Sequence, residues 1–148
     1  MGHRIILTVI LLSFTICSFG DNIFNGAQWI SVSESQNTPN QWFCFRKQVE
    51  CERKHSIAEL NIAVDSKYWL WVNDSLVTFE GGLKRGPNPL DTYYDCVDIS
   101  RFLKKGLNII AIQVWFWGKD GYCHKNSGRA GLLVDLRLGK KERVLSGK

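Results

Sequence analysis

The chain has 148 residues, of which 45% are hydrophobic, so its length suits one domain with a full hydrophobic core. Its formal net charge of +5 comes mainly from the two ends, where Arg4 and four basic residues of the segment 140–148 lie. The body is therefore nearly neutral, which argues against the basic face of a nucleic-acid-binding domain.

The first twenty residues are typical of a secretory signal peptide. Arg4 gives a positive end, the segment 5–16 is apolar, and Ser18 and Gly20 place small residues before a cleavage point after Gly20. The apolar run is shorter than the roughly 18 residues that a membrane span requires. We therefore expect a cleaved signal, a secreted or periplasmic protein and no membrane span in the mature chain, with an uncleaved anchor as the alternative.

After the signal, the sequence is typical of short strands separated by turns. The predicted strands are residues 27–32, 42–49, 57–65, 68–73, 76–80, 93–97, 109–118 and 130–138. They are rich in β-branched and aromatic residues, and the segment 57–65 alternates as a half-buried strand does. Asn73 and Asp74 separate two of the runs and indicate a hairpin, because both residue types tolerate positive φ.

Two stretches lack the pattern of any regular element. Residues 81–92 (GGLKRGPNPLDT) hold three glycines and two prolines, and residues 118–129 (GKDGYCHKNSGR) are polar and rich in glycine. Such compositions are typical of loops, so we expect two long loops.

A single helical turn is predicted over residues 99–105, just before the longest strand. Asp98 can cap this turn by accepting hydrogen bonds from the amide of Arg101 and its neighbour. Gly106 then supplies the left-handed residue that ends the turn.

The strand 109–118 is long and almost uncharged, which indicates a central position in its sheet. Its even positions, from Ile110 to Phe116, form the predicted core face. Its odd positions end in Trp115 and Trp117, which need some other cover, because successive side chains point to opposite faces of a sheet.

About eight strands without a long helix predict an all-β fold, a two-sheet β-sandwich of the jelly-roll type. We place this module at residues 21–139. The segment 140–148 is then expected to be a basic tail that begins a linker to a missing domain.

The mature chain has four cysteines: Cys44, Cys51, Cys96 and Cys123. Cys44 and Cys51 lie on one predicted strand, about 23 Å apart, which is too far for a disulfide. A domain of this size does not need disulfides, so we favour buried thiols, although other pairings stay open. Cys123 and His124 are adjacent and lack a second pair of ligands, so we predict no zinc site and no cofactor.

Several segments resemble the β-sandwich module near the N-terminus of bacterial α-L-rhamnosidases. They are AQWI, WFCFRKQV, YWLWVND, FEGGLKRGP, YYDCVDISRFLKKGLNIIAIQVWFWG and GRAGLLVDL, in this order over residues 27–138. More broadly, the chain is similar to the galactose-binding-like sandwiches attached to many glycoside hydrolases. The resemblance implies a non-catalytic accessory module whose catalytic barrel would lie downstream, so that the chain would be a truncated or split product.

The residues agree with an absence of catalysis by this chain. A glycosidase needs two carboxyl groups about 5–9.5 Å apart across the sugar. Asp91, Asp95 and Asp98 are close in sequence, but Asp98 is the expected cap and Asp95 a strand residue. We predict no catalytic residue. The tripeptide that begins at Asn73 (NDS) matches a glycosylation sequon.

Aromatic residues are the candidates for recognition. Trp69 and Trp71 share one face of their strand and point outward if Leu70 faces the core, as Trp115 and Trp117 do on theirs. Such rings either stack on sugars or are covered by the domain's own loops or by a neighbouring domain, and we favour cover.

Loop residues complete the candidate set. Arg85, Tyr93, Tyr94 and Tyr122 are the expected donors to sugar hydroxyls. By alternation along the strand 93–97, one of the two adjacent tyrosines is expected to face the core.

Two functions from different classes therefore stay open. The first is a carbohydrate-associated module whose partner is a glycan or the catalytic domain of a glycoside hydrolase. The second is an interaction domain without sugar affinity that docks a partner through its tryptophan face.

Overall fold

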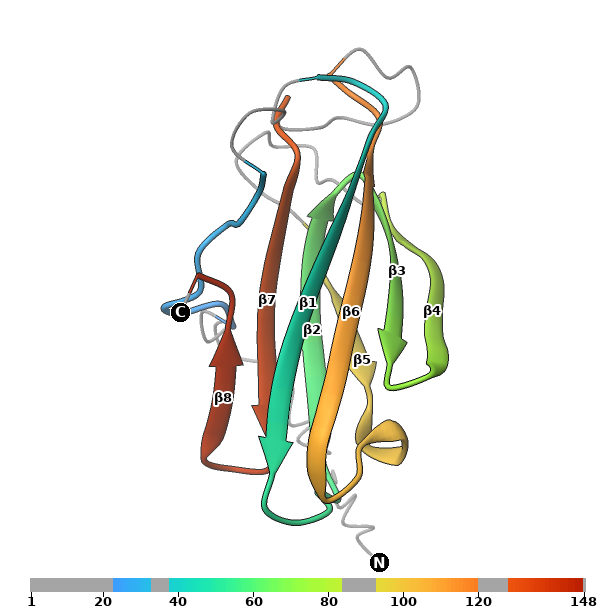
Figure 1. The fold of residues 1–148 in the computed structure, drawn as a ribbon. Coiled ribbons are helices and arrows are strands. Elements are labelled where there is room, and N and C mark those ends of the chain that lie inside the picture. The colour runs from blue at the N-terminus through green and yellow to red at the C-terminus, as the bar shows by residue number, and fades with distance from the viewer. Residues whose placement is uncertain (1–22, 33–37, 84–92, 120–127, 148) are drawn as a thin grey trace, which may run out of the picture.

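The structure, a computed structural model, describes residues 23–32, 38–83, 93–119 and 128–147. Within them, two antiparallel four-stranded sheets pack face to face (Figure 1). The strands are β1 (Gln41–Cys51), β2 (Ala58–Asp65), β3 (Lys67–Val72), β4 (Ser75–Gly82), β5 (Asp95–Asp98), β6 (Gly106–Phe116), β7 (Gly131–Leu138) and β8 (Glu142–Leu145). The predicted all-β, two-sheet sandwich is confirmed.

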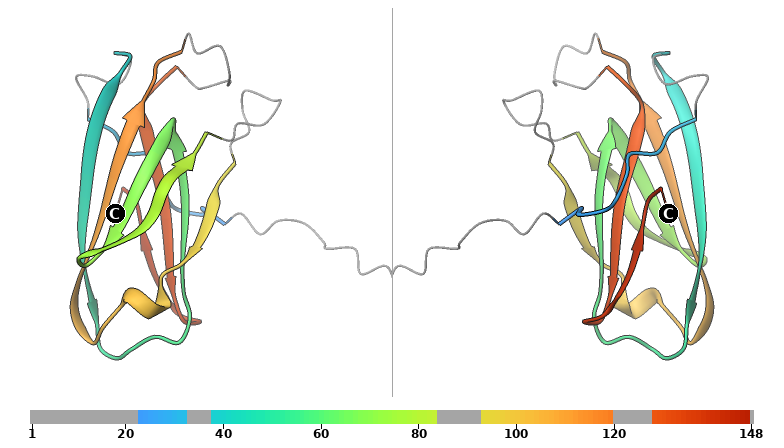
Figure 2. Two further views of the ribbon diagram at one scale, coloured as in Figure 1. Left: turned by 90° about the vertical axis from the view of Figure 1, so that its right-hand side faces the viewer. Right: turned by 90° about the vertical axis from the view of Figure 1, so that its left-hand side faces the viewer.

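The strand order divides the chain between two layers, which Figure 2 shows from their edges. One sheet has the order β1-β6-β3-β4 and the other has the order β5-β2-β7-β8. β6 lies between β1 and β3, so the predicted central position of the longest apolar run is confirmed. Its residues Ile110, Ile112, Val114 and Phe116 are all at most 5% exposed and form the predicted core face.

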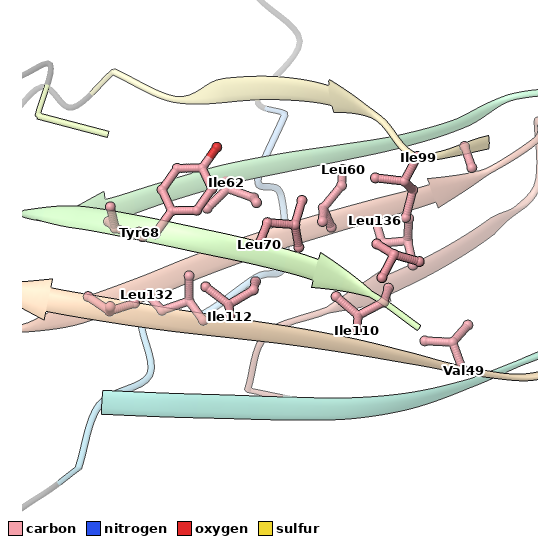
Figure 3. Close-up of a cluster of buried hydrophobic side chains, with 14 of the residues drawn as sticks. Val49, Leu60, Ile62, Tyr68, Leu70, Ile99, Ile110, Ile112, Leu132 and Leu136 are labelled. Atoms are coloured by element: carbon pink, nitrogen blue, oxygen red, sulfur yellow. The ribbon is translucent and has the colours of Figure 1, made fainter. Parts of the chain in front are cut away.

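The core lies between the layers and takes side chains from both of them. Figure 3 shows Leu70 and Ile112 of one sheet pointing toward Leu60 and Leu136 of the other. All four are at most 4% exposed. Burying such apolar area is the main stabilising contribution to the sandwich.

Two predicted elements at the ends of the module are wrong. The strand expected at 27–32 is only a single bridge between Ile30 and Leu132. The segment 140–148, expected to be a basic tail, contains β8, which pairs with β7. Its charges fit a strand because the outer side chains stay in solvent while Val144 packs against the core.

The turn before β6 is a 3₁₀ helix, Ser100–Phe102. Asp98 Oδ1 accepts from the amide of Ser100 at 2.9 Å and from its hydroxyl, so the predicted bonds to Arg101 are wrong. The reason is that the helix begins at Ser100, two residues after Asp98, which favours a local turn of the Asx type. These bonds lower the pKa of Asp98. Gly106 has φ +90°, as predicted.

The hairpin between β3 and β4 is fixed to this turn by Asn73, which has a φ of 54°. Its Nδ2 donates to Phe102 O at 2.9 Å and to Asn108 Oδ1 at 3.1 Å, and its Oδ1 accepts from Ile109 N at 3.1 Å. The amide nitrogen that glycosylation would modify is therefore engaged in two hydrogen bonds. Asn73 of the sequon therefore has a structural role in this hairpin.

The cysteines are less buried than predicted. Cys44, Cys51 and Cys96 are free thiols, but only Cys51 is buried, and Cys123 lies outside the described residues. Cys44 is exposed because it lies on the outward face of β1, whose inward face carries Phe43 and Phe45.

We expect the cysteines to be dispensable for folding. Dithiothreitol should leave the melting temperature of the native chain unchanged, and iodoacetamide should label Cys44 in the folded state but Cys51 only after denaturation. Burial, with the nearby Glu142 and Glu50, raises the pKa of Cys51, which keeps it protonated at neutral pH. Peptide mass mapping would check the labelling. A transition that falls by several degrees in reductant would instead indicate a disulfide.

The predicted signal peptide, residues 1–20, lies outside the described residues, as do the greater parts of both long loops. Within the described ranges, no helix has the length and apolar character to cross a membrane.

Candidate functional site

Large aromatic side chains gather on the outer face of the β1-β6-β3-β4 sheet. Alternation places them there, because the residues between them in sequence face the core. Tyr68, Leu70 and Val72 of β3 are each 0% exposed, whereas Trp69 and Trp71 are half-buried. The predicted outward orientation is confirmed. The same alternation on β6 turns Trp115 outward between two buried residues.

Ring contacts join most of these side chains into one cluster, which we call the aromatic face. Its members are Trp42 on β1, Trp69 and Trp71 on β3, Phe79 on β4, Trp115 on β6 and Trp117 directly after β6. Trp71 completes it because its register partners, Ala111 and Leu76, lie on the same face of the sheet.

The rings in this cluster cover each other. Trp42 stacks on Trp115 with centroids 4.9 Å apart and planes inclined by 6°. Trp42 also lies 5.3 Å from Trp69, and Trp69 meets Phe79 edge to face at 6.1 Å. Trp117 meets Trp115 edge to face at 5.3 Å. Such offset and edge contacts stabilise aromatic pairs beyond their burial.

Polar groups border the aromatic face beside Trp115 and Trp117. The Trp115 Nε1 donates to Asn40 Oδ1 at 2.9 Å. The Lys67 ammonium lies 5.3 Å from the centroid of Trp117 and 2.7 Å from Glu80 Oε2. These contacts orient two of the rings and place a cation–π pair at the border of the cluster.

Much apolar surface is nevertheless open to solvent. Trp42 is 48% exposed, Phe79 is 70% exposed and the neighbouring Leu76 is 48% exposed. A contiguous exposed apolar patch of this kind marks a contact surface more often than a free one.

Trp42 and Phe79 were not among the residues predicted from the sequence. The signal for Trp42 is its place on β1 directly opposite Trp115, which becomes visible only with the register of β1 and β6.

The predicted tyrosines do not join the aromatic face. Tyr93 and Tyr94 precede β5 in the other sheet and are 53% and 41% exposed. The prediction that one of them faces the core is wrong, because the strand begins only at Asp95 and its alternation does not extend to them. Tyr94 contacts the ring of Phe24 edge to face. The other two predicted residues, Arg85 and Tyr122, lie outside the described residues.

The candidate carboxylates have structural partners. Asp95 Oδ2 accepts from the amide of Gly82 at 3.0 Å, and Asp98 holds Ser100. Burial, together with nearby Asp95, raises the pKa of Tyr68, so its phenol is protonated at neutral pH. Asp91 lies outside the described residues. Among the described residues, no group of three or more histidines, cysteines or carboxylates is placed to hold a metal ion.

Comparison with known proteins gives matches among solved structures only; no protein-family model and no curated protein matches the chain. The GH78 family rhamnosidase of Bacillus sp. GL1 has 28% identity and a TM-score of 0.72 over 82% of this chain and 12% of its own. The Streptomyces avermitilis α-L-rhamnosidase, complexed with L-rhamnose, has 20% identity and a TM-score of 0.59 over 82% of this chain and 11% of its own. A Pleurotus ostreatus lectin in complex with GalNAc has 17% identity and a TM-score of 0.57 over 83% of this chain and 34% of its own.

Fold and matches together define a β-sandwich module that is similar to a small part of a GH78 family rhamnosidase. Its structural neighbours include the GH78 family rhamnosidase and other α-L-rhamnosidases, which confirms the resemblance seen in the sequence and is consistent with an N-terminal module of such enzymes. The chain spans only 11–16% of the length of these rhamnosidases.

Proposed function

We propose that the chain is an accessory module of an α-L-rhamnosidase-like glycoside hydrolase and that its aromatic face docks against another domain of that enzyme. The observation that carries this proposal is the exposed apolar patch on the outer face of a complete sheet. The likeness to rhamnosidases of which the chain covers a small part supports a role beside a larger catalytic unit.

The ring geometry favours docking over sugar stacking. A sugar platform presents free ring faces, on which the C–H faces of a pyranose can lie. Here Trp42 turns one ring face to Trp115, and Trp69 lies between Trp42 and Phe79. The cluster therefore forms an apolar surface built from ring edges and partly covered faces. Large aromatic residues of this kind are common anchors of protein–protein contacts.

Direct glycan binding is the second candidate, and one observation favours it. Trp42 is 48% exposed although it stacks on Trp115, so part of its ring is available to a ligand. Gln113 lies between Cys44 and Trp69 in the register of the same face and offers an amide beside the rings. Structures with bound rhamnose and GalNAc among the neighbours support testing this candidate.

We also propose that the protein is exported. The segment 1–20 carries the pattern of a cleaved signal, and the likeness to glycoside hydrolases supports a function outside the cytoplasm. N-terminal sequencing of the protein from the culture medium would test cleavage after Gly20.

The mature chain, residues 21–148, should release no rhamnose from p-nitrophenyl α-L-rhamnoside and should not be retained on rhamnosyl-agarose. The reason is that both described candidate carboxylates hold structural partners and that the aromatic rings cover each other. A complete GH78 rhamnosidase serves as the positive control for turnover.

Two outcomes would contradict the proposal. Turnover that is lost in an Asp95→Asn variant would show catalysis by this chain. Retention on rhamnosyl-agarose that is lost in Trp42→Ser but kept in Trp29→Ser would favour direct glycan binding. Trp29 is the matched control because it is 46% exposed and does not belong to the aromatic face.

A further inference from the structure

An apolar cavity of about 190 Å³ opens at the side of the sandwich where β1 and β8 are the edge strands. Its floor includes Ile110, Ile112, Leu132 and Leu136, which Figure 3 shows between the two layers. The cavity lies between the sheets, so it is separate from the aromatic face on the outer surface of one of them.

The cavity opens because the inward face of β1 is interrupted. Its inward positions carry Phe43, Phe45, Lys47 and Val49, and three of these four are apolar. Lys47 is exposed although the neighbours on its face, Phe45 and Val49, pack in the core. Across the opening, β8 has only four residues and contributes Val144 to the lining.

Protection of a sheet edge explains Lys47 in part. A charged residue that points inward on an edge strand discourages pairing with another strand, and this makes a partner strand a poor occupant of the opening. Edge protection needs no hollow beneath the lysine, however. The apolar cavity is a second, independent feature of the same place.

The lining defines the chemistry of an occupant. An apolar cavity of about 150 Å³ is enough to bind benzene, so this one has room for a single ring or a short alkyl chain. Ser146 lines the cavity, but its hydroxyl donates to Gln28 O at 2.7 Å and accepts from Val134 N at 3.0 Å. Of the described residues that line the cavity, none is acidic and two are cationic, Lys47 in the inward register of β1 and Arg46 in its outward register.

We propose that this edge cavity binds a small amphiphilic carboxylate, with its alkyl or aryl body between the sheets and its carboxylate against the Lys47 ammonium. This proposal is independent of the aromatic face. The apolar floor would supply most of the binding free energy, and the exposed ammonium would add a smaller, salt-sensitive contribution.

The test is a methyl NMR titration of the mature chain with sodium hexanoate and, separately, with 1-hexanol at pH 7 and low salt. Hexanoate should shift the methyl signals of Ile112 and Leu132 and leave the indole signals of Trp42 and Trp115 unchanged. Lys47→Gln should weaken hexanoate binding about fivefold without changing hexanol binding. Lys105→Gln, which removes the same charge at an exposed position outside the cavity lining, should leave both affinities unchanged.

Val144→Phe, which fills the opening from β8, should abolish the binding of both ligands. The proposal is overturned if hexanoate shifts no core methyl signals, or if Lys47→Gln and Lys105→Gln weaken its binding equally. It is also overturned if Val144→Phe folds normally and still binds hexanoate with wild-type affinity. Circular dichroism of each variant distinguishes lost binding from lost folding.

Discussion

Asp135→Ala should lower the free energy of unfolding by about 3 kcal/mol. Asp135 is 0% exposed, on the outer side of β7. Its carboxylate accepts from Arg143 Nε at 3.0 Å, from Arg143 Nη2 at 2.9 Å and from Arg137 Nε at 2.9 Å. These bonds raise the pKa of Arg143. Without the carboxylate, two guanidinium groups lose their shared acceptor, and solvent relieves only part of that cost because both are about one-third exposed.

The two arginines that Asp135 binds also hold Ile23, at the start of the described residues. Arg143 Nη2 and Arg137 Nη2 both donate to the carbonyl oxygen of Ile23, at 2.8 and 3.3 Å. Asp135→Ala should therefore release residues 23–32 and β8 together and make both segments more sensitive to limited proteolysis.

Urea unfolding followed by tryptophan fluorescence would measure the loss of stability. Asp98→Ala is the matched control, because Asp98 is an exposed carboxylate with local partners only, and its removal should move the urea midpoint much less than Asp135→Ala does. An Asp135→Ala midpoint within error of the wild type would show that the pair of arginines does not hold β8.

Alternation was sufficient to predict the parts of the fold where one face of a strand is uniformly apolar. In β6 every second residue from Ile110 to Phe116 is apolar and buried, so the face of each tryptophan followed directly. β3 behaves in the same way because Tyr68, Leu70 and Val72 all face the core.

The two elements that were predicted wrongly, the strand at 27–32 and the tail at 140–148, depend on the pairing of particular residues. β8 holds only two apolar residues, and its place is stabilised by Arg143, whose acceptor Asp135 lies eight residues earlier on the neighbouring strand. Ile30 pairs with Leu132 alone. Neither contact leaves a periodic signal in the sequence, because both depend on the pairing of particular residues.

The aromatic face was predicted in part for a related reason. Trp42 lies on β1, where Lys47 interrupts the apolar face and obscures the alternation. Phe79 lies on β4, whose pairing with β3 shifts register between Tyr68 and Trp71. Such a shift changes which residues of β4 share a face with Trp69, and the sequence does not reveal it.

Leu70→Ala should cost much more stability than Trp71→Ser although the residues are adjacent. Leu70 is 0% exposed in the core, so its truncation should cost about 2–5 kcal/mol. Trp71 is half-buried on the outer face, so its replacement should cost only about 1 kcal/mol. Thermal and urea unfolding of the two variants would compare these losses directly.

Replacing a tryptophan of the aromatic face should reduce self-association of the isolated module. If the aromatic face docks another domain, the isolated module exposes that surface and self-associates through it. Trp71→Ser and Trp42→Ser should therefore move the sedimentation profile toward monomer at concentrations where the wild type associates. Trp29→Ser, which changes an exposed tryptophan outside the aromatic face, should not. A wild-type chain that is monomeric at every concentration, or a Trp71→Ser loss as large as that of Leu70→Ala, would contradict an uncovered docking surface on this side of the sheet.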